Sequence, residues 1–181
     1  MFGLFKRNPN KALIDKLHGE IMAGVQQPAL YLRCGVPDTF EGRLEMLILH
    51  TAATVRRIEK FAAPGPELAQ DLMDGVFRHL DATLREMGVG DITVPKRIKK
   101  HAEAFAGRAL SYSKALEAKD EAALRLALAR NVARDEALAG SPEISRLAAY
   151  VHAVDAQLAG YELDHFLSGK IGFPAPDTGA D

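Results

Sequence analysis

Apolar residues recur at spacings of three and four along most of the chain, which is the period of an amphipathic α-helix. Few stretches alternate strictly between apolar and polar residues, as half-buried strands do. The pattern therefore predicts an all-α fold, a compact single-domain bundle of about six or seven helices. The helices are expected over about residues 9–27, 41–62, 66–87, 95–118, 121–139 and 142–161.

Short polar residues, glycine and proline mark the ends of several predicted helices. Asp38, followed three residues later by Glu41, is a variant of the capping box that begins helices. Ser141 is a good N-cap residue, and Pro142 suits the first helical position. Gly88 is expected to end the helix before it, because glycine adopts the left-handed C-cap conformation without steric cost.

Length and composition limit the classes of protein that fit. The chain has 181 residues and a net charge of −1, so it is long enough for one core and carries no general attraction for nucleic acid. It has no Trp and only 7% aromatic residues, which disfavours stacking on single strands. Its single cysteine, Cys34, excludes an internal disulfide and indicates a reducing compartment. No stretch approaches the roughly 18–20 apolar residues of a membrane span.

The two ends of the chain are expected to lie outside the helical domain. Residues 1–8 are predicted to be a flexible leader, residues 9–168 the helical domain, and the Gly- and Pro-rich residues 169–181 a disordered tail. The leader sets apolar residues beside cations, a pattern suited to shallow insertion into an anionic membrane, with a disordered leader as the alternative. Its candidate membrane contacts are Phe2, Leu4, Phe5, Lys6 and Arg7.

The most unusual charge pattern lies in residues 87–108, MGVGDITVPKRIKKHAEAFAGR. A phosphate-binding loop would need a further glycine, or a Gly-Lys-Ser/Thr sequence after a strand, and neither is present. The cations occupy the first turns of a helix, where the macrodipole favours acidic residues, and such a mismatch can mark a functional surface. Alternatively, this basic helix pairs with the acidic segment 61–91. The candidate docking residues, suited to RNA phosphate, anionic lipid or an acidic protein, are Lys96, Arg97, Lys99 and Lys100.

No catalytic or metal-binding pattern is evident in the sequence. Glu162 and His165 have the spacing of a ligand pair in di-iron helical bundles, but no second pair accompanies them. Sequences typical of zinc proteases, serine hydrolases and dithiol redox sites are absent. We therefore expect neither an enzyme nor a bound cofactor.

The predicted helix over residues 41–62 is apolar on two sides. One side carries Leu44 and Leu47, and the other carries Met46, Leu49 and Ala53. A helix with two apolar sides is either central to the core or offers one side to a partner.

Two blocks of the sequence carry a family resemblance. Residues 31–57 read YLRCGVPDTFEGRLEMLILHTAATVRR, in which GVPDT, GR, LILH and RR are the matching elements. In residues 87–108 the matching elements are MGVGD, the basic run, AEAF and GR, with Ala106 where an aromatic residue is expected. A weaker match covers residues 126–132. On these blocks the chain resembles the α-proteobacterial branch of the ubiquinol–cytochrome c chaperone family.

The resemblance implies an all-helical chaperone without a catalytic site, acting in assembly of the cytochrome bc complex (ubiquinol–cytochrome c reductase) of the respiratory chain. Mitochondrial members bind newly made cytochrome b, work with a small helical partner, and associate with the ribosome and the inner membrane. A bacterial relative is expected to be cytoplasmic and peripheral to the inner membrane. Met46, Leu49 and Ala53 then become a candidate client groove. Arg43, Arg56 and Arg57 are either partner contacts or members of internal salt bridges.

Two other functional classes compete with the chaperone. A helical carrier of a lipid or quinone would need an apolar cavity, which the sequence neither indicates nor excludes. A DNA-binding regulator would need a recognition helix with side chains that read base edges. The lysine-rich start of the helix at residue 95 suits phosphates better than bases, so sequence-specific DNA binding is not expected.

Overall fold

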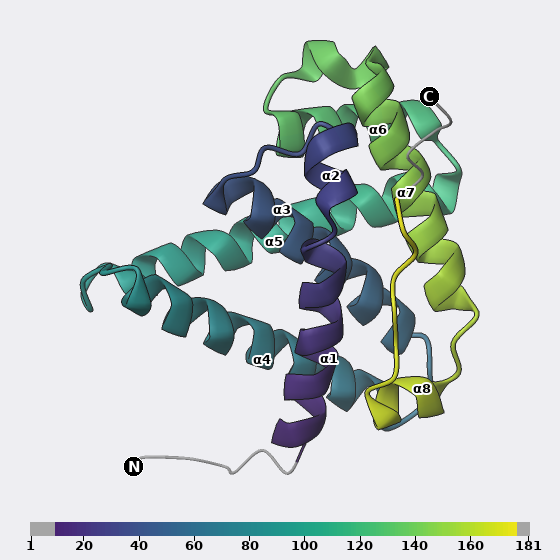
Figure 1. The fold of residues 1–181 in the computed structure, drawn as a ribbon. Coiled ribbons are helices and arrows are strands. Elements are labelled where there is room, and N and C mark those ends of the chain that lie inside the picture. Colours follow the sequence, from purple (N-terminus) through teal and green to yellow (C-terminus); the bar gives the residue numbers. More distant parts are fainter. Residues whose placement is uncertain (1–9, 177–181) are drawn as a thin grey trace.

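The chain folds into α-helices joined by short connections (Figure 1). The computed structural model describes residues 10–176, and this part of the chain contains no strand, which confirms the all-α prediction. The α-helices are α1 (Lys11–Val25), α2 (Pro28–Arg33), α3 (Phe40–Ile58), α4 (Gly65–Glu86), α5 (Val94–Ala118), α6 (Glu121–Leu128), α7 (Pro142–Ala159) and α8 (Leu163–Ser168). A π-helical turn, η1 (Ala129–Ala133), and a 3-10 turn, η2 (Glu136–Gly140), lie between α6 and α7.

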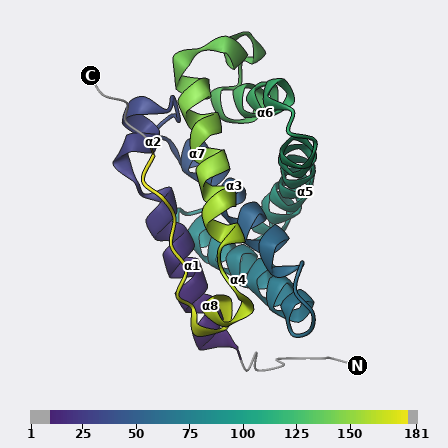
Figure 2. The same cartoon turned by 90° about the vertical axis from the view of Figure 1, so that its right-hand side faces the viewer.

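α3 runs through the centre of the molecule and packs against α1, α4, α5 and α7 (Figure 2). On one side Met46 and Leu49 join the main core with α1 and α7. On the other side Leu44 and Ile48 join a smaller apolar cluster with α4 and α5. The two apolar sides of this helix are therefore explained by its central position.

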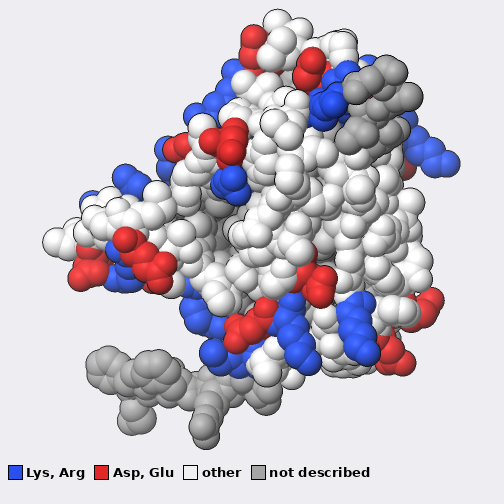
Figure 3. All heavy atoms as spheres, viewed as in Figure 1, with Lys and Arg blue, Asp and Glu red and all other residues white. Residues whose placement is uncertain are grey.

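α4 and α5 form a helical hairpin, whose loop of residues 87–93 lies at the left of Figure 1. The hairpin projects from the body of the molecule, and acidic and basic side chains gather at its tip (Figure 3). Phe77 of α4 and Phe105 of α5 meet edge to face with their ring centroids 6.0 Å apart. Gly88 follows α4 with a φ of +80°, which confirms its predicted role in ending that helix.

Hydrogen bonds at the helix ends confirm one predicted cap and correct another. The Ser141 hydroxyl accepts from the Ile144 amide at 3.2 Å, as predicted for the start of α7. The capping box predicted from Asp38 is wrong, because Thr39 is the N-cap of α3 and accepts from the Gly42 amide at 3.1 Å. Asp38 instead pairs with Arg43 at 2.7 Å.

The helix predicted over residues 121–139 ends early. α6 stops at Leu128, the π-helical turn follows, and Arg134 takes a left-handed conformation with a φ of 59°. The Asp135 side chain then accepts from the Ala137 amide and begins the 3-10 turn. A short acidic side chain that bonds the following backbone offers an alternative to a continuing helix, which is the reason for the break.

The predicted disordered tail is wrong for the described residues 169–176. Ile171 is buried, and the Phe173 ring meets the His50 ring edge to face with centroids 4.8 Å apart. The Gln27 amide donates to the Pro174 carbonyl at 3.0 Å. The segment runs from α8 back along α1 (Figure 2), because its apolar side chains anchor a Gly- and Pro-rich stretch. Residues 177–181 lie outside the described part.

Other predictions concern the membrane and the thiol. Within residues 10–176, no helix has the length and apolar character needed to cross a bilayer. The candidate membrane contacts of the leader lie outside the described residues. Cys34 is buried, and burial raises the pKa of its thiol, which makes this cysteine a packing residue.

Candidate functional site

The four cations predicted to dock a partner lie in the first two turns of α5, and all of them are exposed. Lys99 comes within 3.9 Å of Glu103 on the same helix. Among the described residues, no ion pair joins α4 to α5. Arg85 of α4 pairs instead with Asp81 and with Asp91 of the loop. The interpretation in which the two helices pair through opposite charges is therefore not supported, and these cations face solvent.

Two of these cations line a groove of about 740 Å³ between α3, α5 and η1. Lys96 and Lys99 do not line it, although they lie beside it on α5. Further cations reach the groove from the middle of α5 and from the segment that follows α6. We define this basic groove by its five cations, which are Arg97, Lys100, Arg108, Arg130 and Arg134.

The groove also has apolar lining and a buried ion pair. Phe40, Leu44 and Ile48 of α3 contribute the apolar part. The Arg108 guanidinium donates to a carboxylate oxygen of Glu45 at 2.6 Å, and Glu45 is only 4% exposed. Burial raises the pKa of Glu45, and the nearby Arg108 opposes that rise. The second Glu45 oxygen and the Nε of Arg108 are buried without a hydrogen-bond partner.

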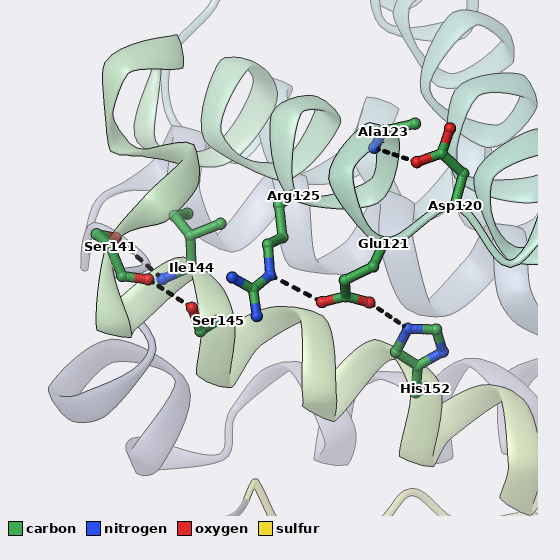
Figure 4. A network of polar contacts seen from close by, with 8 residues as sticks. All are labelled: Asp120, Glu121, Ala123, Arg125, Ser141, Ile144, Ser145 and His152. Carbon is green, nitrogen blue, oxygen red and sulfur yellow. Dashed lines mark hydrogen bonds and ion pairs between the residues drawn. The ribbon is translucent and has the colours of Figure 1, made fainter.

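A polar network between α6 and α7 fixes the helix that leads into the groove (Figure 4). Glu121 accepts from Arg125 at 2.8 Å and lies 2.8 Å from the His152 ring nitrogen. The hydrogen bond with His152, together with that from Arg125, lowers the pKa of Glu121. Asn131 donates to the Tyr112 hydroxyl at 3.3 Å and so ties η1 to α5. These contacts hold η1 where Arg130 lines the groove.

The backbone of the groove is irregular at η1 and Arg134. π-helical turns are rare and occur often at functional sites. A non-glycine residue in the left-handed region costs about 1 kcal/mol or more, and such strain persists only where the surrounding structure imposes it. Arg134, with its φ of 59°, is exposed and lines the groove.

The other three candidate arginines make internal contacts. Arg56 pairs with Asp155 and Glu117, and its side chain is only 15% exposed. Arg57 donates to the Tyr161 carbonyl at 2.6 Å. Arg43 pairs with Asp38, lies over the Tyr31 ring and stays about half exposed. Arg56 and Arg57 thus connect α3 to α7 and to the segment before α8, and Arg43 alone of the three keeps substantial solvent contact.

The client groove predicted along Met46, Leu49 and Ala53 does not exist as an open surface. Met46 is fully buried and Leu49 is 3% exposed, because α1 and α7 cover this side of α3. Leu49 and Ala53 line only a crevice of about 20 Å³, which has room for little more than a water molecule. The prediction is corrected to a core position for this strip.

A second, more apolar cleft of about 260 Å³ lies between α1, α3 and α4. Met22, Leu47 and Leu80 contribute to its lining. The rings of His18 and His79 stack at its edge with centroids 4.1 Å apart. Desolvation lowers the pKa of His18 to about 4, so the ring is neutral at neutral pH. The neutral His18 ring and the aliphatic side chains make most of this lining apolar, with Arg43 as its one guanidinium among the described residues.

The sequence indicated only one end of the basic groove. Arg108 belongs to the Gly-Arg pair at residues 107–108 that carries part of the family resemblance. Arg130 and Arg134 were missed, although their spacing of four residues was a weak signal of a shared helical face. The chain break at Asp135 could have been found from its capping character.

Comparison with known proteins gives concordant findings. The model of the ubiquinol-cytochrome C chaperone family matches residues 32–173, which include every cation of the basic groove. The crystal structure of the Cbp3 homolog from Brucella abortus superimposes with a TM-score of 0.81. The two sequences are 36% identical, over 91% of this chain and 90% of that chain. No curated protein matches this chain in sequence. The chain belongs to the ubiquinol–cytochrome c chaperone family.

Proposed function

We propose that the protein is a non-enzymatic assembly factor of the cytochrome bc complex, and that it binds newly made cytochrome b at the cytoplasmic face of the inner membrane. Family membership supports the role in assembly. The basic groove is the observation that supports client binding, because it is a concave and charged surface that residues 10–176 leave uncovered.

The proposal extends to partners that the family resemblance implies. A newly made membrane protein reaches its chaperone close to the ribosome and to anionic lipid. The exposed cations beside the groove, Lys96 and Lys99, would add attraction to either surface. The leader, with Phe2, Leu4, Phe5, Lys6 and Arg7, would add peripheral membrane contact. A small helical co-chaperone would complete the assembly.

Spectra of membranes from a strain that lacks this gene test the assembly role. Reduced-minus-oxidised spectra should lose the b- and c-type signals of the bc complex and keep those of the terminal oxidases. A copy of the wild-type gene should restore them. Normal bc signals in the deletion strain would overturn the proposed function.

A lipid or quinone carrier is the second candidate function, and the apolar cleft between α1, α3 and α4 favours it. Native mass spectrometry of protein purified without detergent should then reveal a bound lipid or quinone. Replacement of Leu47 by Gln at the cleft should remove that ligand and leave the fold intact. A ligand-free wild-type spectrum would dismiss this candidate.

A further inference from the structure

The positions of the cations in the basic groove limit the shape of its ligand. Arg97 and Arg108 are eleven residues apart on α5, which corresponds to about 16 Å at the helical rise. Arg130 and Arg134 join Arg108 at the end of the groove near η1. None of the described residues forms an ion pair with Arg97, Lys100, Arg130 or Arg134. A single phosphate could meet only one end of this row, so the groove suits an elongated ligand with several negative charges.

The apolar lining limits the chemical class of ligand that fits the basic groove. Phe40, Leu44 and Ile48 would contribute nothing to the binding of a phosphate backbone. Among the described residues, the lining contains no ring besides those of Phe40 and His101, and two separate rings are too few for a run of stacked bases. A flat bilayer cannot follow a concave surface whose charges lie along a groove. A polypeptide segment with acidic and apolar side chains matches both features.

We propose that the basic groove binds an acidic, partly apolar polypeptide segment of the client. Arg97 and Lys100 meet its carboxylates at one end, and Arg130 and Arg134 meet them at the other. Phe40, Leu44 and Ile48 take up its apolar side chains. This inference rests on the proposed function, and it specifies which surface of the chaperone holds the client and what kind of segment is held.

A binding assay with the full chain tests the chemical class of the ligand. The probe is a fluorescein-labelled peptide in which Glu, Leu and Ala form an amphipathic helix. The control is the same peptide with Lys in place of every Glu. The acidic peptide should bind, and the double variant Arg130→Glu/Arg134→Glu should weaken binding by about tenfold or more. Lys60→Glu/Lys170→Glu makes the same change in charge at exposed positions outside the groove and should leave affinity unchanged.

A second pair of substitutions protects the test against misfolding. Arg97→Glu/Lys100→Glu changes exposed helical positions at the other end of the groove. It should lower the affinity for the acidic peptide by a similar factor. Equal losses in the groove variants and in the Lys60/Lys170 control would overturn the proposal. So would peptide binding that is absent while polyuridylate or phosphatidylglycerol vesicles bind through the same arginines.

Cellular experiments separate this proposal from the proposed function. A photo-crosslinking residue at Ala104, which lines the groove, should capture cytochrome b, whereas one at the exposed Ala149 of α7 should not. If the groove variants restore bc spectra fully in the deletion strain, the groove inference falls and the assembly role stands. If the deletion strain has normal bc spectra, the assembly role falls, and the peptide assay decides the chemistry of the groove independently.

Discussion

Replacement of Arg134 by glycine should make the protein more stable and should lower the affinity of the basic groove for an acidic peptide. Arg134 lies in the left-handed region, with φ 59° and ψ 25°, where a side chain collides with its own backbone. Glycine adopts this conformation freely. The relief, of about 1–2 kcal/mol, exceeds the entropic cost of glycine, of about 0.5–1 kcal/mol. The net expected gain is about 0.5–1 kcal/mol in the free energy of unfolding, or a rise of about 2 °C in Tm.

Lys119 provides a matched control for this substitution. It ends α5 with φ 53° and ψ 34°, is exposed as Arg134 is, and does not line the basic groove. Lys119→Gly should therefore give a similar gain in stability with no change in binding of the acidic peptide. Arg134→Gly should lower the affinity for that peptide about two- to five-fold, which is the contribution expected of one exposed cation among several.

Urea unfolding and peptide anisotropy, measured on the same preparations, decide the outcome. A destabilised Arg134→Gly variant would refute the strain interpretation, since the side chain would then contribute more than its backbone conformation costs. One such contribution is electrostatic: burial raises the pKa of Glu45, and Arg134 opposes that rise less than Arg108 does. Equal losses of peptide affinity in both glycine variants would show that Arg134 has no special place in the groove.

Three further predictions concern the core. Burial lowers the pKa of His50 to about 4, from about 6.5 in an unfolded chain. Between these two values the unfolded state binds a proton that the folded state does not bind. The free energy of unfolding therefore falls as the pH decreases from about 6.5 to about 4. The expected loss between about pH 7 and pH 5 is about 2 kcal/mol, and His50→Phe should flatten this slope in urea unfolding. Gly75→Ala would set a methyl group 2.3 Å from the Ile14 side chain and should cost about 1–3 kcal/mol by the same method. Gly19→Ala, at an open position inside α1, should instead stabilise the chain by about 0.5–1 kcal/mol. Phe173→Ala should destabilise the chain by about 1–3 kcal/mol and raise the pKa of His50 by admitting water, which NMR titration of the ring would detect.

The fold class was predictable because the spacing of apolar residues that marks a helix lies within one short stretch of sequence. Ser141 and Gly88 act at helix ends as their chemistry predicts. The prediction of a disordered tail was wrong for residues 169–176 because it followed from their glycine and proline content alone. Ile171 and Phe173 are isolated apolar residues among glycine and proline, and only the packed surface of α1 and α3 shows what they contact.

The candidate site was predictable only where its residues are neighbours in sequence. Arg97 and Lys100 stand out because they oppose the helix dipole within one segment. Arg130 and Arg134 reach the same groove through the packing of α6 on α7 and through a turn that departs from α-helical geometry. Neither the packing nor the turn produces a repeating pattern in the sequence, so the sequence alone does not show that Arg130 and Arg134 lie near the cations of α5.

The unfavourable placement of cations at the start of α5 has a consequence for recognition. The N-terminal end of that helix carries partial positive charge from its aligned peptide dipoles, and Arg97 and Lys100 add full charges beside it. Their mutual repulsion lowers the stability of the free chain. An acidic segment in the basic groove would meet both sources of positive potential, and its binding would relieve the repulsion that the free chain retains. The same feature that violates a rule of helix stability thus increases the gain from binding, as expected of a surface selected for a ligand rather than for the isolated fold.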